Sequence, residues 1–369
     1  MFDVITIGTA VRDAFVVLKD VKDINVQIIK DTRFKTGKAV AFSHGSKISI
    51  PSIVFTTGGG ATNAAATFGR QGFKTACFCV VGADVSGETV MRELQREKVR
   101  FLFKIDPNKE HKTGYSIILL SPDGERTILT YRGASEDLRP NMIPWQKLNA
   151  RMLYLAPLGG ANTETFATIV RHARRKGVAL AVNPSSKTIA KGLAWFSRAI
   201  KGAAVLILNE EEAAYLTGLP YGEDEKIFKK LDRAIGGIIV MTKGPQGVVV
   251  SDGKRIYSAG VFRERALVDR TGAGDAFGSG FVAGLIQRQL RRSQKTRSES
   301  RPQSASGKGK AFRLERVTPE DVHYAIRLGS ANGTSVVEHI GAKEGVLTAR
   351  AARAKRWQSL PVRIKLLNT

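Results

Sequence analysis

The stretch that decides the fold is Val268-Asp269-Arg270-Thr271-Gly272-Ala273-Gly274-Asp275-Ala276-Phe277-Gly278-Ser279-Gly280-Phe281. Its Gly-Ala-Gly turn leads directly into a segment whose apolar residues Phe277, Phe281 and Leu285 recur at helical spacing. The backbone N–H groups at the start of such a helix have no intrahelical acceptors, and they converge on one point. The sequence therefore predicts an anion-binding site at this turn.

Asp275 stands in the first turn of the predicted helix, where two roles are open. Its carboxylate could serve only to cap the helix amides, which is the usual role of a lone Asp at this place. It could also act as a general base beside a bound phosphate. Glycine destabilises a helix start, so the four glycines between 272 and 280 indicate close approach of a ligand to the backbone. They favour the second role.

Outward from this stretch, short β-branched runs alternate with helical patterns. This alternation is typical of an α/β protein, a three-layer sandwich with a mainly parallel central sheet and helices on both faces. The expected strands are Val4–Ile7, Thr75–Val81, Met152–Leu155, Ala179–Val182, Val205–Leu208 and Ile238–Met241. The expected helices are Ala61–Arg70, Glu88–Lys98, Glu164–Lys176, Glu210–Leu216, Asp224–Ala234, Ala276–Gln289 and Pro319–Glu338.

Two regions interrupt this alternation and lack helical patterns. Residues 15–55 contain short alternating pieces at Val26–Ile29 and Lys47–Ile50. Residues 114–131 have the pattern of a hairpin with its turn at Ser121-Pro122-Asp123-Gly124. Strand pairs inserted into an α/β body often cover a site, so we expect a small β lid over the carboxyl edge of the sheet. The α/β body then comprises residues 1–14, 56–113 and 132–347.

Composition limits the class of protein. The chain has 369 residues, of which 43% are hydrophobic and two are Cys, which excludes a collagen, a disulfide framework and a wholly disordered chain. No apolar run approaches the roughly 20 residues of a membrane span. The first residues enter a β-like segment without a basic leader, so we expect a cytoplasmic protein without membrane attachment.

The net charge of +25 raises nucleic acid as a partner. More than half of this excess lies between residues 288 and 316 and beyond residue 343. The first of these segments is also rich in Ser, Gln and Gly, with almost nothing apolar from Ser293 to Lys310, so it cannot bury enough surface to offset its ordering entropy. We therefore expect a basic disordered insertion at 288–316 and a basic C-terminal tail at 348–369.

Two motifs resemble the signatures of a known family. Asp269–Phe277 resembles the C-terminal signature of the ribokinase-like (PfkB) carbohydrate kinases. Gly58-Gly59-Gly60-Ala61-Thr62-Asn63, followed by Val81-Gly82-Ala83-Asp84-Val85-Ser86-Gly87, resembles their N-terminal signature. The resemblance runs from about Asp3 to Leu347. It implies a ribokinase-like fold and an ATP-dependent kinase that transfers the γ-phosphoryl group to a hydroxymethyl group of a small sugar.

The resemblance also implies residue roles around the transferred phosphoryl group. Asp275 would remove the proton of the acceptor hydroxyl, and the amides of Gly272, Ala273 and Gly274 would form the anion hole. The acceptor ligands would be Asp13, Gly58, Gly59, Gly60 and Asn63, with Arg132 at the end of the lid hairpin as a further candidate. Without the resemblance, Asp13 is a loop charge, the three glycines are a turn, and Arg132 is a solvated arginine.

On the nucleotide side, Asn209 and Glu212 match an Asn-x-x-Glu motif that the family associates with Mg²⁺ and phosphate-bound water. Residues of a loop along the phosphates and ribose would be Thr242, Lys243, Gly244 and Gly247. Asn332, with Ser330 as its rival, would border the adenine. Asp269 matches a carboxylate that binds a monovalent cation such as K⁺ in many sugar kinases, although the downstream positions near Glu338 and Gly341 do not clearly match.

Other functions remain open at this stage. A nucleoside kinase of the same fold would use lid aromatics to stack on the base, and the available ones are Phe15, Phe34, Phe42 and Phe55. A nucleic-acid-binding protein on a former kinase scaffold would explain the basic segments, but the intact Asp275 and its glycines argue against it. The exposed strand edges expected in a lid favour a homodimer formed through the lid.

Overall fold

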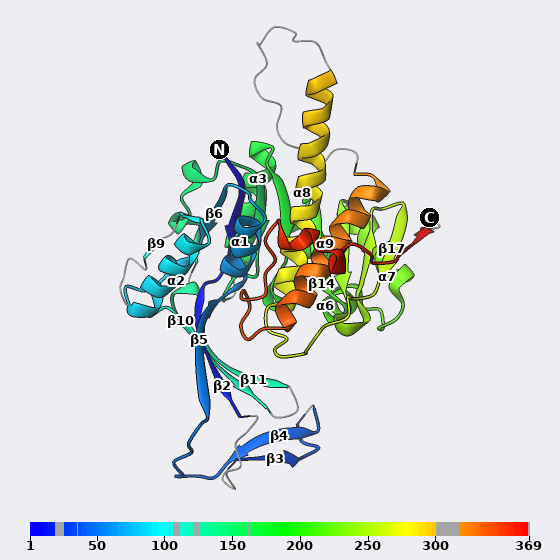
Figure 1. Cartoon of the computed structure of the whole chain (residues 1–369). Coiled ribbons are helices and arrows are strands. Elements are labelled where there is room, and N and C mark those ends of the chain that lie inside the picture. The colour runs from blue at the N-terminus through cyan, green and yellow to red at the C-terminus, as the bar shows by residue number, and fades with distance from the viewer. Residues whose placement is uncertain are drawn as a thin grey trace.

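The computed structural model of the chain describes residues 1–18, 26–34, 36–102, 104–105, 111–121, 125–136, 138–160, 162–299 and 317–367. Ten strands of this described part form one sheet in the order β18-β17-β16-β15-β14-β13-β12-β1-β6-β8 (Figure 1). The neighbouring strands between β15 and β8 in this order pair in parallel, whereas β16, β17 and β18 pair antiparallel. The mainly parallel sheet of the α/β prediction is therefore confirmed. In chain order the ten are β1 Phe2–Ile7, β6 Thr75–Phe78, β8 Arg100–Phe101, β12 Ala150–Leu155, β13 Ala179–Val182, β14 Val205–Asn209, β15 Ile238–Thr242, β16 Val248–Ser251, β17 Arg255–Ala259 and β18 Val362–Leu366.

Helices cover both faces of this sheet, because alternate residues of each strand point to opposite sides. Ile5 and Leu153 pack with helices α3, α5, α6 and α7, whereas Val4 and Met152 pack with α1, α8 and α9. The helices are α1 Gly60–Arg70, α2 Val85–Arg96, α3 Thr163–Lys176, α4 Ser186–Ile189, α5 Leu193–Ala199, α6 Glu210–Thr217, α7 Asp224–Ile235, α8 Ala273–Glu299 and α9 Pro319–Val337. Short 3-10 turns are η1 Gly133–Ser135, η2 Pro140–Met142, η3 Trp145–Lys147, η4 Gly244–Gln246, η5 Ala351–Arg353 and η6 Lys355–Trp357. The three layers of the prediction are present.

Strand β1 lies in the middle of the sheet. Its neighbours are β6, where Val4 is opposite Thr75, and β12, where Phe2 is opposite Ala150. The predicted strand Thr75–Val81 is divided at Cys79 into β6 and β7 Val80–Val81, and β7 pairs with β9 Lys104–Ile105. Its two cysteines are buried free thiols.

The lid is a second sheet that projects from the body (Figure 1). Its strand order is β11-β10-β2-β5, and a separate hairpin pairs β3 with β4. The bounds are β2 Val11–Val17, β3 Val26–Lys30, β4 Lys38–Phe42, β5 Ser52–Gly58, β10 Gly114–Leu120 and β11 Arg126–Tyr131. The two paired strands predicted within residues 114–131 are confirmed as β10 and β11. Residues 122–124 of the predicted turn lie outside the described part. The strand expected at Lys47–Ile50 is wrong, since this mostly exposed segment pairs with no described strand, and the sheet extends a few residues beyond the expected lid, from Val11 to Gly58.

Helix α8 continues to Glu299, well past the expected end at Gln289. The expected start of the insertion at residue 288 is thus a correction: Arg288 and Arg292 are helical, and their guanidinium groups lie 3.0 and 2.8 Å from the carboxylate of the fully buried Asp321. These ion pairs join the part of α8 around Arg288 and Arg292 to α9. Residues 300–316 lie outside the described part. None of the described helices is long and apolar enough to cross a membrane.

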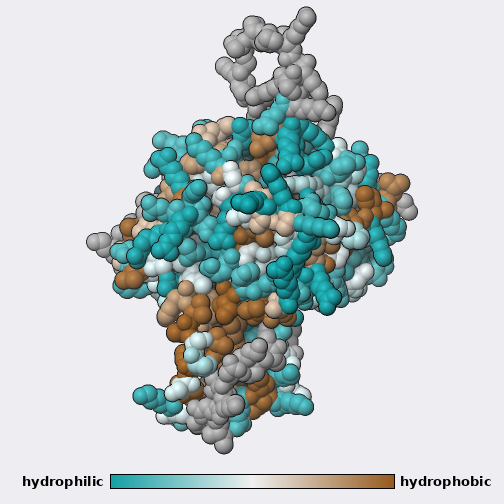
Figure 2. Space-filling model, viewed as in Figure 1, coloured by the Kyte–Doolittle hydropathy of each residue, from teal (hydrophilic) through white to brown (hydrophobic). Residues whose placement is uncertain are grey.

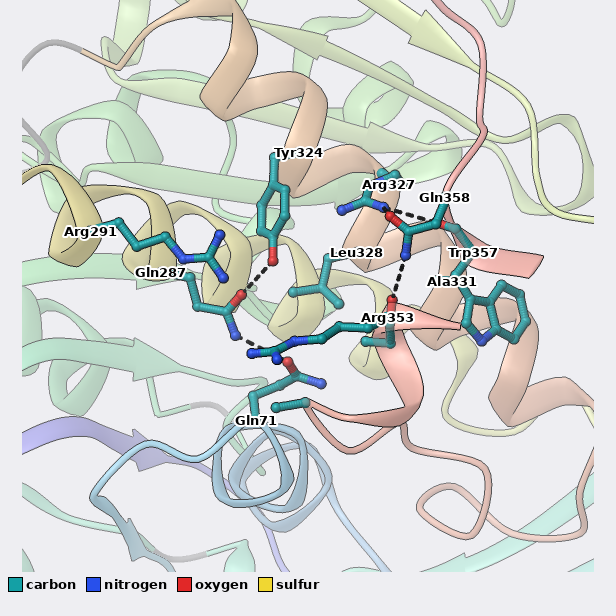
Figure 3. A pocket seen from close by; sticks show the side chains of 12 residues that line it. Gln71, Gln287, Arg291, Tyr324, Arg327, Leu328, Ala331, Arg353, Trp357 and Gln358 are labelled. Carbon is teal, nitrogen blue, oxygen red and sulfur yellow. Dashed lines mark hydrogen bonds between the residues drawn. The ribbon is translucent and has the colours of Figure 1, made fainter. Parts of the chain in front are cut away.

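The basic C-terminal segment is folded onto the body. Strand β18 adds to the sheet edge beside β17, and Trp357 packs edge-on against Phe262 with ring centres 5.1 Å apart. Figure 3 shows the pocket between this segment and helices α1, α8 and α9, about 280 Å³ in volume. There Arg327 donates to Gln358 at 2.5 Å, and Gln287 joins Tyr324 to Gln71 through hydrogen bonds of 2.8 and 3.1 Å.

Candidate active site

The glycine turn before α8 leaves backbone donors free. Gly272 has φ +78°, and a Cβ there would lie 2.4 Å from that of Ala342, so only glycine fits. The N–H of Ala273 donates to Arg270 at 3.4 Å and that of Ala276 to Gly272 at 2.8 Å. Within the described part of the chain, the N–H groups of Gly274 and Asp275 have no acceptor. These donors lie at the positive end of a long helix and are available to an anion.

Asp275 lies beside these free amides and is joined to Asn63 of α1. Asn63 Nδ2 donates to Asp275 Oδ2 at 2.8 Å, across 212 residues of sequence. Burial raises the pKa of the Asp275 carboxyl, and the hydrogen bond from Asn63 acts in the opposite direction. Asn63 is 5% exposed, and its own Oδ1 has no hydrogen-bond partner in the described structure. A raised pKa and an unused acceptor atom next to it suit a group that receives a proton from a bound hydroxyl.

Asp13 is on lid strand β2, not in a loop. It is 4% exposed, and it lies opposite Thr56 of β5 and Ser116 of β10. A Cβ at Gly58 would fall 2.1 Å from Asp13 Oδ2, so glycine there makes room for the carboxylate. Burial raises the pKa of Asp13 to about 6, while a hydrogen bond from Ser116 and the charge of Lys343 lower it. The run of glycines from Gly58 to Gly60 therefore leads from the residue next to the Asp13 carboxylate to the start of α1, the helix that contains Asn63.

Lys343 is buried beside the predicted site, but no sequence pattern predicted it. This lysine is 2% exposed, and its Nζ lies 2.8 Å from Glu93 of α2 and donates to Thr57 of β5. Lysine is almost never buried unless it is paired. A lysine six residues beyond α9, in Gly341-Ala342-Lys343-Glu344-Gly345, carries no local signal, because its partners come from the other end of the chain.

A second cavity, of about 480 Å³, begins at the free amides. Its lining includes Ala273 and Gly274 at the start of α8, and Asn209, Thr242, Gly244 and Gly247 from the loops after β14 and β15. Apolar side chains form much of the remaining wall: Val261, Phe262, Leu267, Phe277 and Val337. A mostly apolar cavity with backbone donors at one end can hold a nucleotide, with the base against the wall and the phosphates at α8.

Three of the expected nucleotide residues, Asn332, Lys243 and Glu212, are not among the residues that line this cavity. Asn332 is fully buried: its Nδ2 donates to Ala276 at 2.8 Å and its Oδ1 accepts from the N–H of Leu347 at 2.9 Å. The prediction for Asn332 is therefore corrected in favour of Ser330, which lines the cavity. Lys243 Nζ lies 3.0 Å from both Asp224 and Glu210, and these ion pairs direct it away from the cavity.

Three further predicted residues have partners of their own. Asn209 and Glu212 form a capping box at the start of α6, each side chain accepting from the other's N–H, at 2.7 and 2.9 Å. Burial raises the pKa of Glu212. Arg132 is about half exposed, and its Nε lies 3.6 Å from Glu136.

Asp269 links the glycine turn to the loop that contains Lys343. Its Oδ1 accepts from the N–H and hydroxyl of Thr271 at 2.9 and 2.7 Å, and its Oδ2 accepts from the N–H of Gly341 at 3.1 Å. These three bonds give the buried carboxylate its hydrogen-bond partners. Among the described residues, no group of three or more His, Cys, Asp or Glu side chains is placed to hold a metal ion.

A cavity that can hold a nucleotide, free amides for an anion and a carboxylate hydrogen-bonded to the buried amide of Asn63 are the parts of a phosphotransferase with an alcohol group as acceptor. Comparison with known proteins identifies the family. The chain belongs to the pfkB family of carbohydrate kinases, whose sequence profile matches residues 32–349.

The chain is similar to several curated and solved kinases. It is 26% identical to a cytidine kinase of Thermococcus kodakarensis over 66% of this chain and 83% of that protein. It is 27% identical to a ribokinase of Haemophilus influenzae over 62% and 74% of the two chains. The solved ribokinase of Cryptococcus neoformans in complex with ADP superimposes with a TM-score of 0.68 at 20% identity, over 96% and 99%. The ribokinase-like fold of the prediction is confirmed.

Proposed function

We propose that the protein transfers the γ-phosphoryl group of ATP, with Mg²⁺, to a hydroxymethyl group of a small sugar of the ribose or fructose type. The observation that carries this proposal is the bond between Asn63 and Asp275. It joins the buried amide side chain of Asn63 to the carboxylate at the anion-binding end of the second cavity. A hydroxyl held at Asn63 would therefore lie next to both the base and the phosphoryl donor.

In this mechanism the chain supplies position and charge rather than a covalent intermediate. Asp275 accepts the proton of the acceptor hydroxyl, and burial raises its pKa, which makes the carboxylate a stronger base. The free N–H groups of Gly274 and Asp275 stabilise the charge on the transferred group. Bound Mg²⁺ would neutralise charge on the phosphates, with Asn209 and Glu212 near it through water. A monovalent cation such as K⁺ at Asp269 stays part of the proposal, because a carboxylate offers about four lone-pair positions and the hydrogen bonds from Thr271 and Gly341 do not fill them all.

Three buried polar groups favour a sugar as acceptor. Asp13 is ionisable and nearly unexposed, and both Asn63 Oδ1 and Thr56 Oγ1 lack partners in the described structure. Such groups suit the several hydroxyls of a polyol. Arg132, half exposed at the end of β11, would contact a polar acceptor only after leaving Glu136. Of the lid aromatics that a nucleoside would need, Phe15 is fully buried with Ile118, while Phe34, Phe42 and Phe55 are exposed.

A nucleoside acceptor is the second candidate, and those three exposed phenylalanines favour it. The test is a screen of the purified protein with ATP and Mg²⁺ against ribose, fructose, fructose 6-phosphate, 2-keto-3-deoxygluconate, adenosine, inosine and cytidine. We expect ADP release with a free sugar, and none from the Asp275→Asn variant. Turnover with nucleosides and with no sugar would replace the first candidate by the second.

The lid also suggests a partner. Figure 2 shows apolar residues gathered on it, and the exposed ones include Ile53, Phe55, Ile117, Ile128 and Leu129. Exposed apolar patches of this kind mark interaction sites, so we propose a homodimer formed through the lid. Sedimentation at several protein concentrations tests it. We place the enzyme in the cytoplasm, where ATP is available and buried free thiols such as Cys77 and Cys79 stay reduced.

A further inference from the structure

The pocket between the C-terminal segment and helices α1, α8 and α9 brings together three arginines from three elements (Figure 3). Arg291 lies on α8, Arg327 on α9 and Arg353 on η5. None of the described residues that line this pocket is acidic. The pocket therefore has a positive charge, and nothing in its own lining neutralises that charge.

Helix α9 separates this pocket from the active site. Leu328 and Ala331 line the pocket, whereas Ser330 and Gly333, on another side of the helix, line the second cavity. The two cavities have no lining residue in common. A ligand in the pocket would therefore lie apart from the anion-binding turn before α8.

The charges of the three arginines also lack acidic partners elsewhere in the described part of the chain. No carboxylate there pairs with Arg291 or Arg353, and both are exposed, so a ligand can reach them from solvent. Arg327 donates through Nη1 to the carbonyl of Trp357 at 3.2 Å and to Gln358 Oε1 at 2.5 Å. Both of these acceptors are neutral. All three guanidinium groups therefore remain available to an anion.

Two of these guanidinium groups share one aromatic ring. Arg327 and Arg291 lie 5.0 and 6.0 Å from the centre of the Tyr324 ring. A third guanidinium group, that of Arg288, lies 5.9 Å from the same ring, but it is paired with Asp321. The ring attracts each cation, while the unpaired cations repel one another. An anion between them would remove this repulsion.

Two glutamines add oriented hydrogen-bond donors to the pocket (Figure 3). Tyr324 donates to Gln287 Oε1 at 2.8 Å, and Gln287 Nε2 donates to Gln71 Oε1 at 3.1 Å. Gln71, which is 6% exposed, donates in turn to the carbonyl of Leu347 at 2.7 Å. These bonds fix the direction of both amides. Each Nε2 uses one of its two hydrogens in them and keeps the other for a further acceptor.

We propose that this pocket binds the phosphate group of a small phosphorylated molecule, at a site distinct from that of phosphoryl transfer. Guanidinium groups suit phosphate because their planar fork donates two parallel hydrogen bonds. A tetrahedral phosphate offers oxygens to three arginines that approach from three elements, whereas a carboxylate has only two oxygens. The volume of about 280 Å³ is at the small end for ligand pockets, so the rest of the molecule is small.

Calorimetry at low ionic strength tests the site, with inorganic phosphate and D-ribose 5-phosphate as probes. The variant that combines Arg291→Gln and Arg353→Gln should lower the affinity of the pocket for phosphate at least tenfold. The matched control is Arg350→Gln, an exposed arginine of the same segment that does not line the pocket. The inference is supported if the double variant loses a binding event, for either probe, that the control retains. It is overturned if the double variant binds both probes as the native protein does.

Two competitors test the kind of ligand. Citrate presents carboxylates instead of phosphate, and it should bind the pocket at least tenfold more weakly than the better of the two probes. Equal affinity for citrate would overturn the assignment to phosphate. A single-stranded RNA oligonucleotide tests a polymer as the ligand. If the double variant loses RNA binding while neither small probe binds the pocket, the arginines belong to a nucleic-acid surface and the inference is wrong.

Thermal unfolding separates a ligand site from a purely structural role. At low salt without phosphate, the double variant should melt at the same temperature as the native protein or higher, because it removes two repelling charges. Phosphate should then raise the melting temperature of the native protein more than that of the variant. A lower melting temperature of the variant with an equal effect of phosphate on both proteins would overturn the inference. These measurements do not use catalysis, so a failure of the sugar screen would leave them unaffected.

Discussion

The nucleotide half and the acceptor half of the active site use different groups. The nucleotide half relies on backbone: free N–H groups at the start of α8, glycines in two loops and an apolar wall. The acceptor half relies on buried polar side chains, namely the ionisable Asp13 and the amide of Asn63. Backbone donors do not titrate, whereas buried charges respond to pH and to one another. We therefore expect ATP binding to be nearly independent of pH and acceptor binding to depend on it.

The largest effect is expected from a substitution of Asp275, which lies between the nucleotide half and the acceptor half. Asp275→Asn should lower turnover by roughly 100-fold or more, because it removes the base. ATP binding should hardly change, because the free N–H groups of α8 remain. Turnover with ATP and the selected sugar, together with calorimetric binding of ATP, checks both expectations. Turnover close to that of the native enzyme would refute the role of Asp275.

The buried charge of Asp13 should reduce stability. Its pKa is about 6 in the folded protein against 3.8 as the ordinary value, so the folded state binds the proton more tightly. Stability therefore falls as pH rises from about 4 to 6. Asp13→Asn removes this penalty, and it should raise the free energy of unfolding at pH 8 by roughly 1–3 kcal/mol. Urea unfolding at pH 8 and pH 4 measures this, and an equal gain at both values would contradict it.

Substitutions of the two proposed acceptor ligands, Asp13 and Asn63, should change different kinetic constants. Asp13→Ala should raise the KM of the acceptor by roughly 10-fold and leave that of ATP unchanged, because a polyol hydroxyl loses its partner. Asn63→Ala should raise the same KM and also lower kcat at neutral pH, because its hydrogen bond lowers the pKa of Asp275. Steady-state kinetics at several pH values distinguishes them. Variants that weaken ATP and spare the acceptor would mean that the two halves are assigned the wrong way round.

The smallest effect concerns the basic segment after α8. Replacement of residues 300–310 by a short Gly-Ser linker should change the free energy of unfolding by no more than about 0.5 kcal/mol and leave kcat unchanged. Apart from Ala305 and Pro302, this stretch has no apolar residue with which to pack. Arg288 and Arg292 stay in place, since their ion pairs with Asp321 precede it. A large loss of stability or of activity would show that it packs on the body.

Local signals made the fold and the glycine turn predictable. The alternation of strands and helices, the turn before Asp275 and the hairpin at 114–131 each depend on neighbouring residues. The end of α8 was not predictable in this way, because its last apolar residues precede Arg291 while the partner of Arg292 is Asp321, on the next helix. Lys47–Ile50 alternates without pairing, since alternation alone does not supply a partner strand.

The buried position of Lys343 could not be predicted from the sequence. Lys343 and Thr57 are 286 residues apart, and neither lies in a motif that points to the other. Asn332 and Ser330 show a different limit. Both are on α9, but two residues turn a helix by more than half a circle, so that one faces the cavity and the other the interior.

The central place of β1 sets an order of assembly. The strand gains one neighbour, β6, after some 75 residues, but the residue opposite Phe2 is Ala150. Once β6 is made, a ribosome that adds about 5–20 residues per second needs roughly four to fifteen seconds more to make the second neighbour. During that time Val4 and Ile5, fully buried in the finished protein, depend for cover on α1 and β6, the elements already made. Synthesis rate, and not only sequence, therefore decides how long this strand is open to other chains.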